Sequence, residues 1–401
     1  MKGMCPAIVS VGRTKFGEHY ESAPESLVEE SGLSALSSAS IERRDLNACH
    51  FADYFLPITN KLGLEEGFLS ELLELNVPME ITRSFGSALS NACNAVLAGK
   101  YELVLVGGME KMTDRWDKIR DDLMLLEDPW SYYAGCTPEA NHELMLRAYI
   151  KRYGVTGEHL DVLNTALAEF SVKNHRNAMK NKYAQFHKEI SVDTVIKARA
   201  RARRPLGLFD FAPISDGASA LILTNSDLAE SYTDKPVYIR GYSLATDYIT
   251  FPSRNDLTGF VATRLAIKDV LKTSDIRLDD ISILELYDSS TMMGMVSLED
   301  LGFCEKGKAW MDIYKSSQEN EDYFELDGRK VFVNMNGGLK ADGNPLGATG
   351  GAEIFEVFQQ LRREAGERQV KADGELRYGC VHELEGFGTK AYVYVLGRQL
   401  T

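Results

Sequence analysis

The predicted elements occur in the same order twice along the chain. The first series opens with the strand AIVSVG (7–12) and reaches a turn that leads into a helix of small residues, SFGSALSNACNAVLAG (84–99). A buried strand, ELVLVGGMEKM (102–112), follows that helix. The second series opens with PVYIRGYS (236–243), and the glycine-rich turn NMNGGLKADGNPLGATGG (334–351) again leads into a helix. The repeat predicts two copies of one topology; a chance run of ordinary strand–helix units is the alternative.

Alternating strands and helices predict an α/β fold with a mostly parallel sheet. A chain of 401 residues exceeds one ordinary core, and we predict an N-terminal half at 1–235 and a C-terminal half at 236–401. The segment from about 113 to 200 has no counterpart in the second half, is rich in Tyr, Trp, His and charge, and is predicted to be a largely helical insertion. An excursion over the ends of parallel strands is where α/β proteins build ligand sites.

Composition and charge argue against several classes of protein. Hydrophobic residues make up 44% and charged residues 26% of the chain, as in a soluble globular protein, and apolar runs such as 103–109 are too short to span a membrane. The 59 acidic residues exceed the 45 basic ones, and the net charge of −14 argues against broad nucleic-acid binding. The first residues lack the pattern of a secretory signal and GRQLT (397–401) is no organelle address, so we expect a cytoplasmic protein.

One basic run is a candidate phosphate site, and the spacing of the cysteines tests for a metal site. KARARARR (197–204) either meets an anionic, phosphate-bearing ligand or forms a solvated face, and the second interpretation is the more common one. Six cysteines are spread along the chain without Cys-x-x-Cys or Cys/His spacing. Free thiols in a reducing compartment and no metal site are therefore expected.

Several segments resemble, in order, the motifs of the thiolase superfamily. They include GKYELVLVGGMEKMTD (99–114), SVKNHRNAMKNKYAQF (171–186), PISDGASALIL (213–223), SLEDLGFCEKG (297–307) and GNPLGATGG (343–351). Within that family the chain is most similar to the non-specific lipid-transfer, or sterol-carrier, type. The resemblance covers nearly the whole chain. It implies the five-layered αβαβα thiolase fold with duplicated halves and a helical loop-domain insertion.

The resemblance implies acyl transfer between acyl-CoA and a carbon or sulfur acceptor. In the family a cysteine at a helix N-terminus forms an acyl-enzyme, and the histidine of a Gly-His-Pro turn activates it. Counting back from the strand at 102–112 places the nucleophile at Thr82, and a shift of one residue places it at Arg83. Neither is a cysteine, and Cys93 lies about three turns along the predicted helix. Thr82 and Ser84 remain as hydroxyl nucleophiles, whereas Arg83 favours an anionic group.

Three further positions depart from the family pattern. Asn344 stands where the Gly-His-Pro histidine is expected; it cannot accept a proton at neutral pH but can donate an N–H to an oxyanion. Tyr287 stands before Asp288 where the family has a His-Asp pair, and its phenol either polarises a carbonyl or packs at the end of a strand. His382 takes the place of the second catalytic cysteine, where it acts as an acid or base near neutral pH or is a hydrogen-bonded turn residue.

The resemblance also implies ligands and partners. Substrate contacts are expected from Asp288 and from glycines of the turns, namely Gly338, Gly343, Gly386 and Gly388. No cofactor is expected, and CoA or an acyl-CoA is the candidate ligand or substrate. We expect a homodimer or higher oligomer, with or without a small OB-fold partner protein.

Three interpretations of function remain open. Because the cysteine and the histidine are both replaced, we favour an atypical relative of acetyl-CoA acetyltransferases and 3-ketoacyl-CoA thiolases that binds acyl groups or forms complexes. One alternative is an active acyltransferase with altered residues, including one that acylates an aromatic ring or another carbon, since some such enzymes carry Tyr-Asp. The other is a non-catalytic structural subunit of a multi-protein complex. Whether the chain is an enzyme stays open.

Overall fold

The computed structural model describes residues 4–115, 117–319, 322–372 and 374–400. The outermost residues of the two predicted halves, 1–3 and 401, lie outside this description, and the boundary between 235 and 236 stays a prediction. Among the described residues, no helix combines the length and the apolar character that a membrane crossing requires.

The strands of the described chain form one mixed sheet in the order β3-β2-β4-β5-β1-β6-β11-β10-β7-β9-β8. The strands are β1 (Pro6–Arg13), β2 (Ala48–Ala52), β3 (Met79–Thr82), β4 (Val104–Lys111), β5 (Asp216–Asn225), β6 (Val237–Thr246), β7 (Ile281–Leu286), β8 (Phe324–Leu326), β9 (Arg329–Val333), β10 (Tyr378–Glu385) and β11 (Lys390–Gly397). The α-helices are α1 (Pro24–Ser38), α2 (Leu56–Thr59), α3 (Glu65–Leu73), α4 (Phe85–Leu97), α5 (Ile119–Asp122), α6 (Pro129–Tyr133), α7 (Pro138–Tyr153), α8 (Glu158–Ala178), α9 (Val192–Ala202), α10 (Ala229–Tyr232), α11 (Val261–Ser274), α12 (Thr291–Asp300), α13 (Ala309–Glu319), α14 (Gly338–Ala341) and α15 (Leu346–Arg362).

The predicted repeat is present in the sheet. The order β3-β2-β4-β5-β1 of the first half recurs as β9-β7-β10-β11-β6 in the second. β2 lies parallel to β3 and β4, as β7 does to β9 and β10. β5 and β11 run antiparallel to both of their neighbours. The duplicated α/β fold is therefore confirmed, and a short pairing of β1 with β6 joins the two copies into one sheet.

Two expectations about the strands are wrong. The sheet is mixed and not mostly parallel, because β10 and β11 form a hairpin across residues 386–389 and β5 returns antiparallel to β4. The segment Tyr378–Glu385 is a strand, whereas one of the two interpretations of His382 places that residue in a turn. Apolar content identifies a buried strand but carries no information about its direction.

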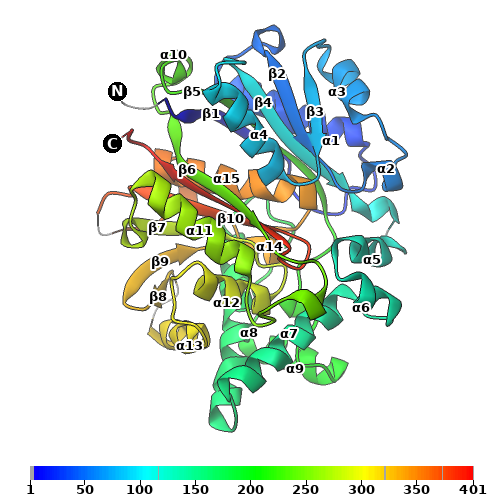
Figure 1. Cartoon of the computed structure of the whole chain (residues 1–401), viewed down its shortest axis with the longest axis vertical. Helices are drawn as coiled ribbons and strands as arrows, with labels where there is room; N and C mark the ends of the chain where they lie inside the picture. The colour runs from blue at the N-terminus through cyan, green and yellow to red at the C-terminus, as the bar shows by residue number, and fades with distance from the viewer. Residues whose placement is uncertain (1–3, 116, 320–321, 373, 401) are drawn as a thin grey trace.

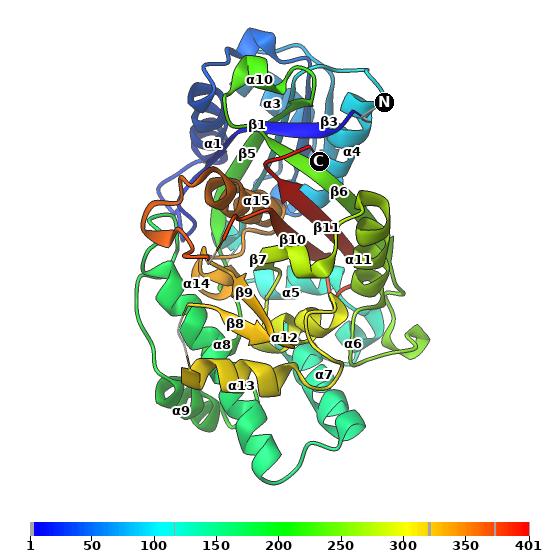
Figure 2. The same cartoon turned by 90° about the vertical axis from the view of Figure 1, so that its left-hand side faces the viewer.

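Helices and the two halves of the sheet are arranged in layers, as expected for the thiolase fold (Figures 1 and 2). α1 packs on β1, β4 and β5, and α11 packs on β6 and β11. α4 and α15 contact each other between the halves, with α15 against strands of both. Small residues permit this approach: a Cβ added to Gly351 would lie 2.5 Å from the Phe85 ring of α4. The glycine-rich turn therefore serves close packing of α15.

The predicted insertion is helical, as expected. Between β4 and β5 the chain passes through α5, α6, α7, α8 and α9, of which α7, α8 and α9 lie at the lower end of the molecule in Figure 1. Apolar residues recur at intervals of three and four along α8, and Leu163, Leu167 and Phe170 are fully buried. α8 packs on α12, α13 and α14, so its apolar face ties the insertion to the second half.

Candidate active site

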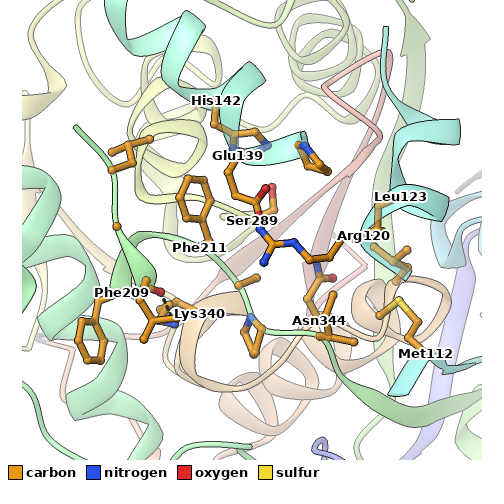
Figure 3. Close-up of a pocket in the computed structure, with 18 of the residues that line it drawn as sticks. Met112, Arg120, Leu123, Glu139, His142, Phe209, Phe211, Ser289, Lys340 and Asn344 are labelled. Carbon is orange, nitrogen blue, oxygen red and sulfur yellow. Dashed lines mark hydrogen bonds and ion pairs between the residues drawn. The ribbon is translucent and has the colours of Figure 1, made fainter. Parts of the chain in front are cut away.

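A cavity of about 580 Å³ lies between the insertion and the loops that follow β7 and precede α15. The insertion contributes residues of α5, α7 and the segments around 123–127 and 202–214, and the second half contributes Tyr287, Asn344 and Gly386. Figure 3 shows Arg120 and Glu139 meeting within this space, near Asn344. Three of the residues predicted to form the site therefore share one cavity.

Tyr287 and Asn344 place two hydrogen-bond donors on the cavity wall. Tyr287 follows the end of β7 and Asn344 lies before α15; both side chains are largely buried. The Thr349 hydroxyl donates to Asn344 Oδ1 at 2.8 Å, which leaves the amide N–H groups to donate. Burial raises the pKa of Tyr287, and the hydrogen bond with Asn344 offsets this only in part. The phenol therefore keeps its proton at neutral pH and acts as a donor.

Glu127 is a cavity residue that no sequence motif identified. Its Oε2 accepts a hydrogen bond from Asn141 Nδ2 at 2.9 Å. Burial raises the pKa of Glu127 to about 7, and the Asn141 bond and the charge of Arg254 act in the opposite direction. In the sequence, this residue is one acid in a charged insertion, beside the proline that begins α6. Only its burial distinguishes it from a solvated carboxylate.

His142 of α7 also lines the cavity and was not predicted. Its Nδ1 lies 2.7 Å from Ser290 Oγ, which already accepts the Met293 N–H at 3.1 Å. Burial lowers the pKa of His142 to about 3, so the ring is neutral at pH 7.

Cationic side chains line another part of the cavity. Arg204, from the predicted basic run, lies in the wall and bonds to Glu143 at 2.7 Å. Arg199 of the same run is buried in a two-bond ion pair with Asp210, with distances of 2.8 and 2.6 Å. The run is therefore neither a phosphate site as a whole nor a simple solvated face. Lys340 also lines the cavity, and burial lowers the pKa of its amine to about 8.

The predicted nucleophile region lies apart from the cavity. α4 begins at Phe85 with Ser84 as its N-cap, so the helix starts three residues after Thr82 and two after Arg83. Thr82 ends β3, its hydroxyl bonds to the Ser84 carbonyl oxygen at 3.2 Å, and the Arg83 side chain is 69% exposed. Among the described residues that line the cavity, none is Thr82, Arg83 or Ser84. Which of the two positions matches the nucleophile of the family therefore stays a prediction.

Two carboxylates of β10 occupy the start of α4. Glu383 Oε2 accepts the Gly86 N–H at 2.7 Å, and Glu385 Oε1 accepts the Ser84 hydroxyl proton at 2.6 Å. Burial raises the pKa of Glu383 to about 8. The sequence offers no sign of this contact, since residues 86 and 383 meet only when the two halves pack. The backbone N–H group that the family directs at a nucleophile or its product is already bonded within this chain.

The cysteines of the described chain lie away from the cavity wall. Among the described residues lining it, none is a cysteine. Cys93 and Cys380 are fully buried. Burial raises the pKa of Cys93 well above its usual value and that of Cys380 to about 12, so both thiols stay protonated. The described residues also contain no group of three His, Cys, Asp or Glu side chains placed to hold a metal ion.

His382, predicted as an acid or base or as a hydrogen-bonded residue without chemistry, lies in the core with a hydrogen-bond partner. It lies within β10 and not in a turn, is fully buried, and its Nε2 lies 2.9 Å from Thr263 Oγ1. Burial lowers the pKa of His382 to about 3, so the ring does not take up a proton at neutral pH. The cavity wall, as far as the structure describes it, does not include this residue.

Asp288 and three of the four predicted glycines, namely Gly338, Gly343 and Gly388, are not part of the described cavity wall. Asp288 is buried and accepts the Leu339 N–H at 2.8 Å, and burial raises the pKa of its carboxyl to about 8. The neighbouring turns need positive φ angles, 58° at Gly338 and 116° at Gly343, and the hairpin turn needs 68° at Gly388. Of the predicted substrate-binding residues, the described cavity wall includes Gly386 alone.

Comparison with known proteins identifies the family. Residues 6–227 match the thiolase N-terminal domain, and residues 243–398 match the thiolase C-terminal domain-like family. An acetyl-CoA acetyltransferase of Methanothermobacter thermautotrophicus is 35% identical over 401 residues, which cover 98% of this chain and 99% of that protein. Sterol carrier protein 2 of Oryctolagus cuniculus is 29% identical over 392 residues, or 90% of this chain and 67% of that protein.

A solved structure shares the fold. A chain of the structure described as "Ltp2-ChsH2(DUF35) aldolase" superposes with a TM-score of 0.79 at 20% sequence identity, and the match covers 98% of both chains. At this identity the likeness establishes the fold alone.

Proposed function

Because the chain belongs to the thiolase superfamily and to its sterol-carrier type, we propose that it binds the thioester of an acyl-CoA beside Tyr287 and Asn344 without forming an acyl-enzyme at α4. One observation carries this proposal. Two buried donors from separate elements face one cavity, while the first N–H groups of α4 are used by a carboxylate of the same chain.

The two donors suit the oxygen of a thioester carbonyl. Tyr287 offers its phenolic O–H, and Asn344 offers an amide N–H because Thr349 holds its oxygen. Donors that are fixed before the ligand arrives stabilise the negative charge that develops on such an oxygen, each by a factor of about 10²–10³ in rate. Neither group takes up a proton at neutral pH, so they polarise the carbonyl without acting as a base.

The start of α4 does not suit a covalent intermediate. Phe85 occupies the first helical position, where the family pattern has the nucleophile at a helix N-terminus. The Glu383 carboxyl accepts the Gly86 N–H, so an acyl oxygen would have to displace it. A ligand bound at the cavity therefore meets Tyr287 and Asn344, not a nucleophile.

Charge at the cavity suits an anionic ligand end. Arg120, Lys188 and Arg204 all contribute to the wall. Arg120 and Arg204 are each paired with a glutamate, whereas Lys188 is exposed. A positive side chain at a cavity mouth attracts the phosphate groups of CoA.

Binding and intact mass test the proposal together. With acetyl-CoA and a longer acyl-CoA, we expect an increase in Tm and measurable heat of binding, with no stable gain in protein mass. Tyr287→Phe should weaken acyl-CoA binding severalfold. Tyr133→Phe is the matched control, because its phenol is 79% exposed and outside the described cavity wall. A mapped acyl adduct would contradict the non-covalent proposal, and the absence of any binding would contradict the ligand.

An assembly role is the second candidate, favoured by exposed apolar side chains on the insertion. Leu125 and Trp130 are both 66% exposed, beside residues that line the cavity. Tyr132 and Tyr133 of the same segment are exposed as well, at 42% and 79%. We propose a homodimer, or a complex with a small OB-fold partner, in the cytoplasm. Light scattering of Trp130→Glu against the native chain checks this: an unchanged multimer, or a monomeric native chain, would contradict the role of this surface.

A further inference from the structure

We infer that Glu127 is the proton-transferring group of the cavity: its carboxylate takes a proton from the carbon next to the thioester carbonyl while Tyr287 and Asn344 bind the carbonyl oxygen. This rests on the proposed binding of an acyl-CoA thioester in the same cavity. It adds an activity, enolisation of the bound acyl group, and names the residue that performs it.

The local structure leaves one oxygen of Glu127 free for a ligand. The side chain is largely buried yet contributes to the cavity wall. Oε2 is held by Asn141 Nδ2 at 2.9 Å, and Asn141 is itself bonded to Ser131 Oγ at 3.2 Å. Oε1 has no hydrogen-bond partner among the described residues. A carboxylate with one oxygen anchored and the other facing a cavity has the geometry of a positioned base.

Packing brings Glu127 close to the two donors. Leu126, the residue before Glu127, packs directly against the hairpin turn between β10 and β11. A Cβ added to Gly386 of that turn would overlap the Leu126 carbonyl oxygen. Gly386 itself lines the cavity together with Tyr287 and Asn344. The charge of Glu127 contributes to raising the pKa of Tyr287, which is an effect of proximity in a buried region.

The charges around Glu127 leave it able to exchange protons at neutral pH. Burial raises its pKa to about 7; the Asn141 bond and Arg254 lower it, while Glu139 and Asp128 raise it. Both the acid and its conjugate base are therefore present near pH 7, which suits proton transfer in either direction. Glu139 lines the same cavity; its Oε1 is ion-paired with Arg120, and its Oε2 is buried without a hydrogen-bond partner among the described residues.

Tyr287, Asn344 and His142, which line the same cavity, do not serve as the base. Tyr287 keeps its proton because burial raises its pKa, and Asn344 has no basic nitrogen. His142 is a poor proton acceptor, since burial lowers its pKa to about 3.

The step balances without a further reactant. The C–H bond next to the carbonyl breaks, its proton forms an O–H bond on Glu127 Oε1, and the electron pair moves into the thioester to give an enolate. Tyr287 and Asn344 bind the enolate oxygen. Return of the proton regenerates the acyl-CoA, with no oxidation or reduction. Such an enolate is also the nucleophile needed for attack on a carbon acceptor.

Hydrogen–deuterium exchange measures this step directly. The full chain is incubated in D₂O with acetyl-CoA and, separately, hexanoyl-CoA, and loss of the proton signal next to the carbonyl is followed by NMR. We expect exchange above the buffer rate in the native chain. E127Q should slow it about 100-fold while acyl-CoA binding changes less than about threefold. D121N is the matched control, an exposed carboxylate of the same insertion outside the described cavity wall, and should exchange at the native rate.

Each outcome separates the inference from the proposed function. Binding without exchange of either acyl-CoA, or native exchange in E127Q, would overturn the role of Glu127 and leave the binding proposal intact. Absence of binding overturns both. If E127Q does not fold, the pH profile of the native chain decides: because the base form is needed, exchange should rise with pH through about 7, and a flat profile from pH 6 to 8 overturns the inference.

Discussion

Replacing Glu383 with glutamine tests which of two opposing effects on the charged carboxylate is larger: the attraction of the positive end of α4 or the cost of burial. Glu383 Oε2 accepts the Gly86 N–H at 2.7 Å, and the positive end of the helix favours a charged carboxylate by up to about 2 kcal/mol. Burial opposes the charge more strongly, since it raises the pKa of Glu383 to about 8 from the model-compound value of 4.5. The amide of E383Q keeps an oxygen that accepts the Gly86 N–H but carries no charge.

The size of the effect follows from proton linkage. The folded-state pKa of Glu383 is raised, so the folded chain holds this proton more tightly than the unfolded chain does. The protonated carboxyl therefore makes its full contribution to the free energy of unfolding below pH 4.5, and that contribution is lost as the pH rises through about 8. At pH 7 the unfolded chain has released this proton while the folded chain still holds it. About 1.4 kcal/mol per pH unit over roughly 2.5 units gives on the order of 3 kcal/mol. The glutamine of E383Q does not titrate, so this variant does not lose stability in this way. Its free energy of unfolding at pH 7 should exceed that of the native chain by up to about 3 kcal/mol.

Thermal melts from pH 4.5 to 8.5 test this prediction. We expect E383Q to have a higher Tm than the native chain at pH 7 to 8, with the difference vanishing toward pH 4.5. Glu25, an exposed acid in the first turn of α1, provides the matched control. E25Q should lower the Tm slightly at every pH above 5, because only the helix-end attraction acts there. A lower Tm of E383Q at pH 8 would refute the reasoning and show that the helix end outweighs burial.

Two further predictions concern the cavity. Gly386→Val places a Cβ on the Leu126 carbonyl oxygen, so it should lower the Tm and abolish acyl-CoA binding; Gly135→Val, also at positive φ but with open space around its Cβ, should retain binding. Loss of binding in both variants would point to backbone strain alone. Thr349→Val removes the hydroxyl that holds Asn344 Oδ1, at a cost of about 1 kcal/mol, so calorimetry should show roughly fivefold weaker binding of acetyl-CoA. An unchanged Kd would mean that another group orients the amide.

The fold was largely predictable because its signals are local. Apolar runs marked β1, β4 and β6, and the glycine-rich turn marked the start of α15. The repeat of these signals predicted the duplicated topology that the strand order shows. Strand direction was not predictable, since a buried strand has the same apolar composition in parallel and antiparallel pairs.

The candidate site was predictable only where a motif lies at the end of a strand or at the glycine-rich turn. Tyr287 and Asn344 line the cavity as such positions suggest. His382 is only a few residues from the cavity turn in sequence, but the alternation of side chains along β10 directs it into the core. Counting residues along the sequence cannot tell a cavity residue from a core residue, because a shift of one position along a strand moves a side chain to the opposite face of the sheet.

The order of elements, the duplicated α/β class and the positions of Tyr287 and Asn344 followed from the sequence, because apolar periodicity and glycine act on neighbouring residues. The membership of the cavity was decided by the tertiary structure. Glu127 comes from the insertion, while Gly386 and Asn344 come from the second half, and they meet only when the helices of the insertion pack on that half. The same packing sets the burial that moves the pKa of Glu127 to about 7, a property that no residue type carries on its own.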